Sequence, residues 1–447
     1  MKIRGLLIAA LVLAALAGTL YWSNHKKPAA DTVKAADATP KVLSLKESDI
    51  SQIEIKKKGQ PDLTLEKADG NWKITAPKPL GADQSAVGSM VTSLSSLDAD
   101  RVIEEKAGDL SGFGLKDPAF EVDVTAAGNQ VHKLIVGDTA PTGNSTYAMV
   151  EGDPRVFTIA NYNKTSLDKS VGDLRDKRLL TADFDKASEI ELRTSKDDIA
   201  FGRNKDSWQI VEPKPMRADS FQVDELVRSL KDAKMQTAST VTDDKKDASE
   251  FAAGKPVATV KVTALNGTQT LEVRKNKNDY LAKSSVLPGV YKVENSVGAS
   301  VDKKLDDFLN KKLFDFGYAD PDKMEVHDGA KSYFFTRSGT DWWGPEGKKL
   351  DLDSVDALLE KIRDLSASKY PATGFNNPQI QLVVTSNDKK RTEKVEIATS
   401  GDGYIAKRED EPELYEISAA DVENIQKAAA AVKVAPPPAP AAPAKKK

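Results

Sequence analysis

The sequence predicts an α+β fold of three tandem duplicated domains, each an antiparallel sheet packed with one main amphipathic helix, behind an N-terminal transmembrane helix. Three observations support this prediction. A segment that ends a strand and opens a helix occurs three times, and a second set of strand residues recurs at nearly the same interval. In addition, the chain begins with an apolar stretch that carries no charge between Gly5 and Trp22.

The repeated segment joins a tryptophan to an aspartate through a proline-containing connection. The first two copies match without a gap at a constant offset of 136 residues, and the third copy is looser at its tryptophan. The residues that define the repeat are Trp72 and Asp83 in the first copy, Trp208 and Asp219 in the second, and Trp342-Trp343 and Asp351 in the third.

Each aspartate precedes apolar residues at helical spacing, such as Val87, Met90 and Leu94. A carboxylate oxygen accepts hydrogen bonds from the free amides of a first helical turn, so these aspartates are expected to be N-caps; in the first copy Ser85 is an alternative cap. The tryptophans lie in short alternating segments and are expected to pack in the core, with stacking on a ligand as the alternative. The prolines are expected to hold the connection extended.

Later strand residues repeat as well, which extends the duplication through each domain. The alternating pattern of 122–124 recurs in 260–262 at an offset of 138, and again in 382–384. A period near 135 residues is too long for a solenoid repeat, so the copies are predicted to be separate domains. The predicted boundaries are 42–182, 183–318 and, for a shorter and divergent third copy that ends in a helix capped by Ser418, 319–427.

The two chain ends are predicted to lie outside these domains. Residues 1–4 form a short basic leader, 5–22 a transmembrane anchor or signal segment, 23–41 a flexible linker and 428–447 a disordered Ala/Pro/Lys tail. About 20 apolar residues span a bilayer core, so 5–22 is just long enough for an anchor, and Ala15-Leu16-Ala17 leaves cleavage as a signal peptide open. We expect a single-pass protein of the inner (cytoplasmic) membrane with the bulk of the chain in the periplasm.

The composition excludes several classes of function. Lys and Arg number 65 against 68 Asp and Glu, so the charge needed to bind nucleic acid is missing. The chain has no cysteine, which excludes disulfides, thiolate metal sites and thiol nucleophiles. The three histidines are isolated, and the two S-x-x-K matches at Ser166 and Ser366 lack the companion motifs of Ser/Lys acyl-transfer enzymes. We therefore predict no enzyme activity, no catalytic or metal-binding residues and no cofactor.

Trp342 and Trp343 form the one candidate contact with a partner or ligand. Neighbouring residues of a strand point to opposite faces, so one of the two indoles can be exposed. An exposed indole can stack on a sugar or hold a side chain of a protein partner. The alternative is that both are buried between the sheet and a neighbouring domain.

The segment from Trp72 to Asp83, its second copy and the Phe113-Gly114-Leu115 to Pro118 stretch resemble the bacterial domain-of-unknown-function family 4340. The resemblance extends over roughly Val42 to Ile425, and the third copy departs from it at the tryptophan connection. It implies a membrane-tethered protein, of a kind often encoded beside auxiliary gliding-type ABC transporter components. It implies no catalytic residues.

These observations together predict a non-enzymatic, membrane-anchored envelope protein that acts as a scaffold or accessory subunit of an ABC transporter-type complex. Its expected partners are the membrane, through the N-terminal helix, and other envelope proteins. The alternative is an extracytoplasmic binder of polysaccharide or cell-wall material that uses the Trp342-Trp343 region.

Overall fold

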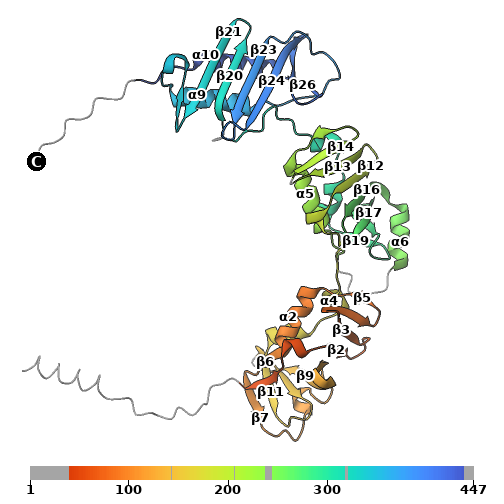
Figure 1. Cartoon of the computed structure of the whole chain (residues 1–447). Helices are drawn as coiled ribbons and strands as arrows, with labels where there is room; N and C mark the ends of the chain where they lie inside the picture. Colours follow the sequence, from red (N-terminus) through yellow and green to blue (C-terminus); the bar gives the residue numbers. More distant parts are fainter. Residues whose placement is uncertain (1–39, 142, 206, 237–243, 318–320, 437–447) are drawn as a thin grey trace, which may run out of the picture. The chain divides into compact units, whose positions relative to one another are not determined.

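Within the described residues, the β structure forms three large antiparallel sheets and one two-stranded sheet (Figure 1). The structure is a computed structural model that describes residues 40–141, 143–205, 207–236, 244–317 and 321–436. These residues divide into two compact units, one of 40–177 and the other of 178–436. Helices pack on the sheets, so the predicted α+β class is confirmed.

The first sheet alternates buried and solvent-facing residues along its central strands. Ile53 and Ile55 are buried on one face, where Val87, Met90 and Leu94 of the main helix pack against them. Each such buried side chain contributes about 1.5–3 kcal/mol to folding. In spatial order the strands are β5 (Leu80–Gly81), β4 (Asn71–Ala76), β3 (Leu63–Ala68), β2 (Gln52–Lys57), β8 (Phe120–Ala126), β9 (Gln130–Thr139), β10 (Ser145–Val150), β11 (Val156–Ala160) and β7 (Arg101–Glu104). The helices are α2 (Gln84–Ser95), α3 (Asn161–Leu167) and α4 (Val171–Leu174), and β1 (Lys41–Ser44) pairs separately with β6 (Ser96–Asp98).

The second sheet has its earliest strand, β12, in the middle, as the first sheet has β2. Ile190 and Leu192 of this strand are buried against Val223, Leu226 and Leu230 of the main helix. In spatial order the strands are β15 (Met216–Arg217), β14 (Ser207–Glu212), β13 (Asp198–Asn204), β12 (Glu189–Thr194), β16 (Lys255–Ala264), β17 (Gly267–Asn276), β18 (Asp279–Ser284) and β19 (Tyr291–Val293). The helices are α5 (Ser220–Lys231), α6 (Asp244–Ala253), α7 (Asn295–Val301) and α8 (Leu305–Phe308).

The third sheet is covered on one face by two helices (Figure 1). Met324 and Val326 point to this face and pack with Leu358 of one helix and Ile425 of the other. In spatial order the strands are β22 (Asp341–Trp343), β21 (Lys331–Ser338), β20 (Pro321–Asp328), β23 (Ile380–Ser386), β24 (Arg391–Ser400), β25 (Gly403–Arg408) and β26 (Leu414–Ile417). The helices are α9 (Leu352–Asp364) and α10 (Ala419–Ala431), and Ser418 accepts a hydrogen bond as the N-cap of α10, as predicted.

The proline connection is less extended than predicted. Cis peptide bonds precede Pro77 and Pro213, and the chain then turns back so that the two-residue strands β5 and β15 pair with β4 and β14. The alternation pattern is too short in these two-residue strands to mark them in the sequence.

Three predicted boundaries are wrong by a few residues, because short apolar segments pack into the core that follows them. Leu179 and Leu180 belong to the core of the second sheet, not to the first domain of 42–182. Residues 313–316 likewise pack into the core of the third sheet, not into the domain of 183–318. At the C-terminal end α10 runs to Ala431, so the tail predicted from 428 begins too early.

No helix of the described residues is long and apolar enough to cross a membrane. The predicted leader of 1–4 and the transmembrane or signal segment of 5–22 lie outside the described residues, as do most of the linker of 23–41 and the part of the tail from 437 to 447.

Candidate functional site

Apart from Trp343, the residues that define the repeat either cap a helix or lie buried in a core. Asp83 accepts hydrogen bonds from the amides of Ser85 and Ala86, and Asp219 and Asp351 each accept one from an amide in the first turn of α5 and α9. The predicted aspartate N-caps are therefore confirmed. The tryptophans that precede them are buried: Trp72 is 7% exposed, Trp208 6% and Trp342 4%.

Trp342 and Trp343 lie on opposite faces of β22. Trp342 belongs to the core beneath the helices, whereas Trp343 is partly exposed and lies directly across from Thr336 of β21. Residues opposite each other in an antiparallel pair share a face, so Trp343 lies on the face of the third sheet that α9 and α10 leave uncovered. Of the two indoles in the predicted contact, this leaves Trp343 as the one available to a ligand or partner.

Two further rings lie on the same open face. Phe334 of β21 is 41% exposed and lies two residues from Thr336, and its ring centroid is 5.4 Å from that of His327 in an edge-to-face arrangement. His327 is held by Ser332 and Glu325, whose oxygens lie 2.9 Å and 3.2 Å from its ring nitrogens. We call Trp343, Phe334 and His327 the aromatic face.

Sequence reasoning did not find Phe334. It lies between two other aromatic residues, Tyr333 and Phe335, so a pattern of alternating apolar and polar residues does not mark it as solvent-facing. The signal available was the register with β20, where the outward Glu325 pairs with Phe334 and the buried Met324 with Phe335. That register becomes known only with the fold.

A second group of functional interest lies where the second sheet meets the third. Arg217, at the end of β15, donates to Asp315 Oδ2 at 2.7 Å, and its Nε lies 2.7 Å from Glu411 Oε1. The same guanidinium donates to the carbonyl oxygen of Lys312. Nearby, Lys214 of the proline connection pairs with the buried carboxylate of Glu413 at 3.4 Å. Side chains of the second sheet therefore hold acidic groups of the third.

Two more arginines complete this group, which we call the junction cluster. Arg408 lies 2.9 Å from Glu411 and 3.4 Å from Glu393, and Arg391 lies 3.1 Å from Glu393 and 3.4 Å from Asp315. Three arginines thus face three carboxylates, so the formal charges balance. Buried charges persist only when they are paired in this way. The junction cluster was not predicted, because the members that make the contact are far apart in sequence, 98 residues in the case of Arg217 and Asp315.

The pKa values of the junction cluster reflect this pairing. Burial would raise the pKa of Asp315, but the Arg217 charge and a hydrogen bond from Asn310 outweigh it, and the pKa lies below its usual range. Burial lowers the pKa of Arg217, and the Asp315 and Glu411 charges more than compensate, so its pKa is raised. Burial and a hydrogen bond to Glu411 raise the pKa of Tyr415 well above its ordinary value. These shifts keep Asp315, Arg217 and Tyr415 in their usual charge states at neutral pH, which suits a structural network of ion pairs.

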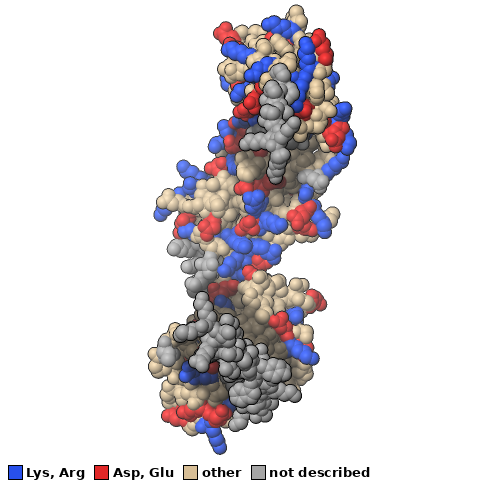
Figure 2. Space-filling view, turned by 90° about the vertical axis from the view of Figure 1, so that its left-hand side faces the viewer, with Lys and Arg blue, Asp and Glu red and all other residues tan. Residues whose placement is uncertain are grey.

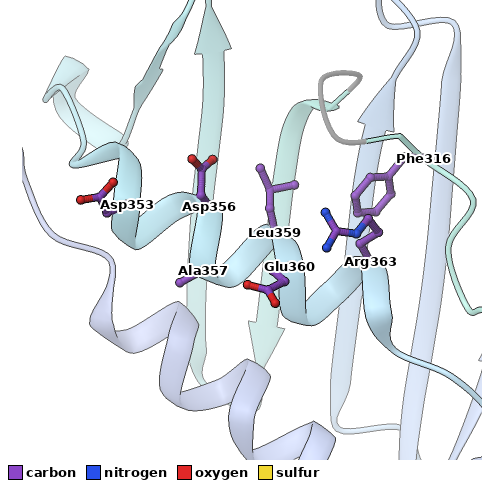
Figure 3. Close-up of a pocket in the computed structure, with 7 residues that line it drawn as sticks. All are labelled: Phe316, Asp353, Asp356, Ala357, Leu359, Glu360 and Arg363. Atoms are coloured by element: carbon purple, nitrogen blue, oxygen red, sulfur yellow. The ribbon is translucent and has the colours of Figure 1, made fainter.

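A pocket of about 570 Å³ opens beside α9 (Figure 3). Asp353, Asp356 and Glu360 bring carboxylates to it from one helix, and the guanidinium of Arg363 lies beside the ring of Phe316. Because acidic side chains dominate, the pocket favours a cationic group over an anion.

Acidic and basic side chains are interspersed over the surface that Figure 2 presents, and neither sign dominates there. Across the described ranges, no group of three or more His, Asp or Glu side chains is placed to hold a metal ion.

The comparisons with known proteins give one match. No curated protein and no solved structure matches the chain. The profile of the family described as "Domain of unknown function (DUF4340)" matches two adjacent segments, residues 72–207 and 208–394. The segments begin at Trp72 and Trp208, the first residues of the two best-matched copies of the repeat. The resemblance found in the sequence is thereby confirmed, and the chain belongs to the DUF4340 family, whose function is unknown.

Proposed function

We propose that the chain is a non-enzymatic scaffold or accessory subunit of the bacterial cell envelope. In this proposal residues 5–22 anchor it in the inner membrane as a single-pass protein, and the folded part lies in the periplasm. The sheet-and-helix modules arose by duplication, and they present surfaces to protein partners in an ABC transporter-type complex.

The observation that carries this proposal is the junction cluster. A hinge between two modules needs a connection with few contacts, whereas Arg217 is tied to Asp315, Glu411 and the Lys312 carbonyl at once. Breaking a buried ion pair by removing one partner costs about 3–5 kcal/mol, so the two modules resist separation. A rigid pair of modules with balanced surface charge and saturated ionisable groups fits a protein that positions partners.

Crosslinking in native membranes tests this function. The full chain, tagged at its C-terminus, is crosslinked in the intact cell envelope, and the products are identified by mass spectrometry. We expect recurrent crosslinks from folded residues to a membrane component of an ABC transporter. Arg217→Ala should reduce their yield because it loosens the junction, whereas Arg228→Ala, which removes an exposed pair with Glu225, should not. Recovery of the chain alone with several crosslinker lengths would refute the scaffold function.

The orientation has its own test. A protease added to cells with a permeabilised outer membrane should degrade the folded part, and protection of the folded part until the inner membrane is opened would contradict the periplasmic location.

The second candidate function is binding of polysaccharide or cell-wall material, which the partly exposed Trp343 and the exposed Phe334 favour. Trp342 is buried, so its replacement would damage the core, and Trp343→Gln is the informative variant. Co-sedimentation of the chain with purified peptidoglycan that falls on this substitution would support the candidate. Co-sedimentation that is absent, or unchanged by Trp343→Gln, would dispose of it.

A further inference from the structure

The aromatic face is specific to the third sheet. At the register position of Trp343 the first sheet has Lys73 and the second has Gln209, each across from its partner strand in the same way. At the position of Phe334 they have Thr64 and Ala200. The sheet therefore forms without aromatic side chains at these positions, and the rings of the third sheet need another explanation.

The C-terminal end of the described chain lies beside this face. Val434 pairs with Leu350, and the amide of Ala435 donates to the carbonyl of Lys349 at 2.9 Å. Lys349 in turn pairs with Trp343 at the edge of the third sheet. Neighbouring strands are about 4.8 Å apart, so the chain reaches Pro436 at about 10 Å from the Trp343 backbone.

The residues that follow have the composition that aromatic surfaces recognise. The stretch from Pro436 to Lys447 holds five prolines, no acidic residue and three lysines at its end. Such a sequence favours the polyproline II helix, which rises about 3.1 Å per residue and needs no internal hydrogen bonds. Proline-rich segments in this conformation dock on surfaces lined with aromatic side chains, and little entropy is lost because the helix is preformed.

The lengths agree as well. Thr336, between Trp343 and Phe334 on the open face, is three strand spacings from Ala435, about 14 Å. Four to five residues of polyproline II would cover this distance, which in that conformation would bring Ala439 beside Thr336. In that conformation the eleven residues of 437–447 would span about 34 Å, enough to pass Trp343, Phe334 and His327.

We propose that the C-terminal segment 436–447 of this chain docks as a polyproline II helix on its own third sheet, across Trp343 and Phe334. The occupant is this segment because the described chain ends beside the rings and continues with prolines. This inference goes beyond the scaffold function and does not depend on it.

Disulfide trapping in the full chain tests the proposal, because the natural chain has no cysteine. The trapping pair is Thr336→Cys with Ala439→Cys. The matched control is Glu66→Cys with Ala439→Cys, because Glu66 lies across from Lys73 in the first sheet as Thr336 does from Trp343. Under mild oxidation we expect a disulfide within one chain for the trapping pair, formed at least ten times faster than for the control.

A second pair of substitutions shows whether the rings hold the segment. Trp343→Gln and Phe334→Ala give the third sheet the side chains of the second, Gln209 and Ala200, and both native side chains are at least partly exposed. In the trapping pair these substitutions should slow disulfide formation several-fold, with unchanged circular dichroism.

Each other outcome overturns the proposal. Equal rates for the trapping pair and its control show that the segment does not favour the face, and a rate unaffected by the ring substitutions shows that the rings do not bind it. A disulfide between two chains assigns the face to the segment of a second copy. The face would instead be assigned to a glycan if two results held together. Without peptidoglycan fragments, trapping would be no faster than in the control, and with added fragments the remaining trapping would be abolished.

Discussion

Arg217→Ala is the substitution that most directly tests the junction cluster. It removes one guanidinium and leaves the folds of both sheets otherwise unchanged, because Arg217 lies at the end of the two-residue strand β15. Asp315 and Glu411 each lose a cation at 2.7 Å, and the Lys312 carbonyl loses a donor.

The expected cost follows from what remains. Arg391 at 3.4 Å and Arg408 at 4.0 Å still face Asp315, and Arg408 lies 2.9 Å from Glu411. The two carboxylates therefore lose one partner each but keep another, so we expect a cost of about 2–3 kcal/mol, less than the roughly 3–5 kcal/mol for a buried charge left without a partner. Arg217→Lys keeps a charge but not the planar fork, and it should recover part of this loss.

Hydrogen exchange measured by mass spectrometry is the suitable assay, because unfolding of a chain with several modules need not be two-state. The amides of Leu313 and Asp315, which donate to the Leu365 carbonyl and to Glu393, report on the junction. We expect their protection to fall by about 30-fold to 150-fold in Arg217→Ala, the equivalent of 2–3 kcal/mol. Amides of β9 in the other unit should be unaffected.

The pH dependence of hydrogen-exchange protection at the junction shows whether the pairing of Asp315 with Arg217 is stabilising. The pKa of Asp315 is lowered in the folded protein, so its pairing adds stability above the unfolded value of about 3.9, and this stability is lost as the pH falls. Arg217→Ala should therefore make junction protection less sensitive to pH between 5 and 3. The control is Arg228→Ala, whose exposed pair with Glu225 should be worth less than about 0.5 kcal/mol. If Arg217→Ala costs no more than this control, the junction cluster does not hold the modules together.

Three further expectations concern stability and are measured by the hydrogen-exchange protection of amides in the module that carries the substitution. Trp342→Ala should cost about 3–5 kcal/mol, because the indole is buried, whereas Trp343→Ala should cost under about 1.5 kcal/mol; equal losses would place both indoles in the core. Gly298→Ala should lower the stability by about 1–3 kcal/mol, since a Cβ there would lie 2.2 Å from the Tyr280 ring. Gly88→Ala in α2 should raise the stability by about 0.5–1 kcal/mol, because a Cβ there would have no atom within 4 Å. The opposite order would show that the contact at Gly298 relaxes freely. Asp351→Ala should cost about 1 kcal/mol and Asp351→Ser much less, unless the cap of α9 is dispensable.

The sequence predicted the features that depend on neighbours along the chain. The caps at Asp83, Asp219 and Asp351 need only a short polar side chain before a helical apolar pattern, and the structure has all three. The burial of Trp72 and Trp208 follows in the same way from alternation within a strand.

What the sequence did not predict depends on which separated residues meet. Leu179-Leu180 and Leu313-Phe314 are apolar pairs between two domains, and nothing local says whether they complete the core before them or the core after them. The partners of Arg217 are equally hidden, because Arg and Glu are common on solvated surfaces and only the fold brings these together.

The boundary that was misplaced explains why the junction cluster lies where it does. Leu309 belongs to the second core and Leu313 to the third, so only the three residues 310–312 pass between them. These residues are not free: the Asn310 amide donates to the Arg217 carbonyl at 3.0 Å, and the Asn310 carbonyl accepts from the Tyr370 hydroxyl at 3.3 Å. A connection this short and this well bonded has little conformational entropy to release, so flexing at this point would have to break the ion pairs as well. The connection 310–312 and the junction cluster therefore act as one element. Because of this element, a fixed arrangement of the second and third sheets explains the observed contacts better than a hinge does.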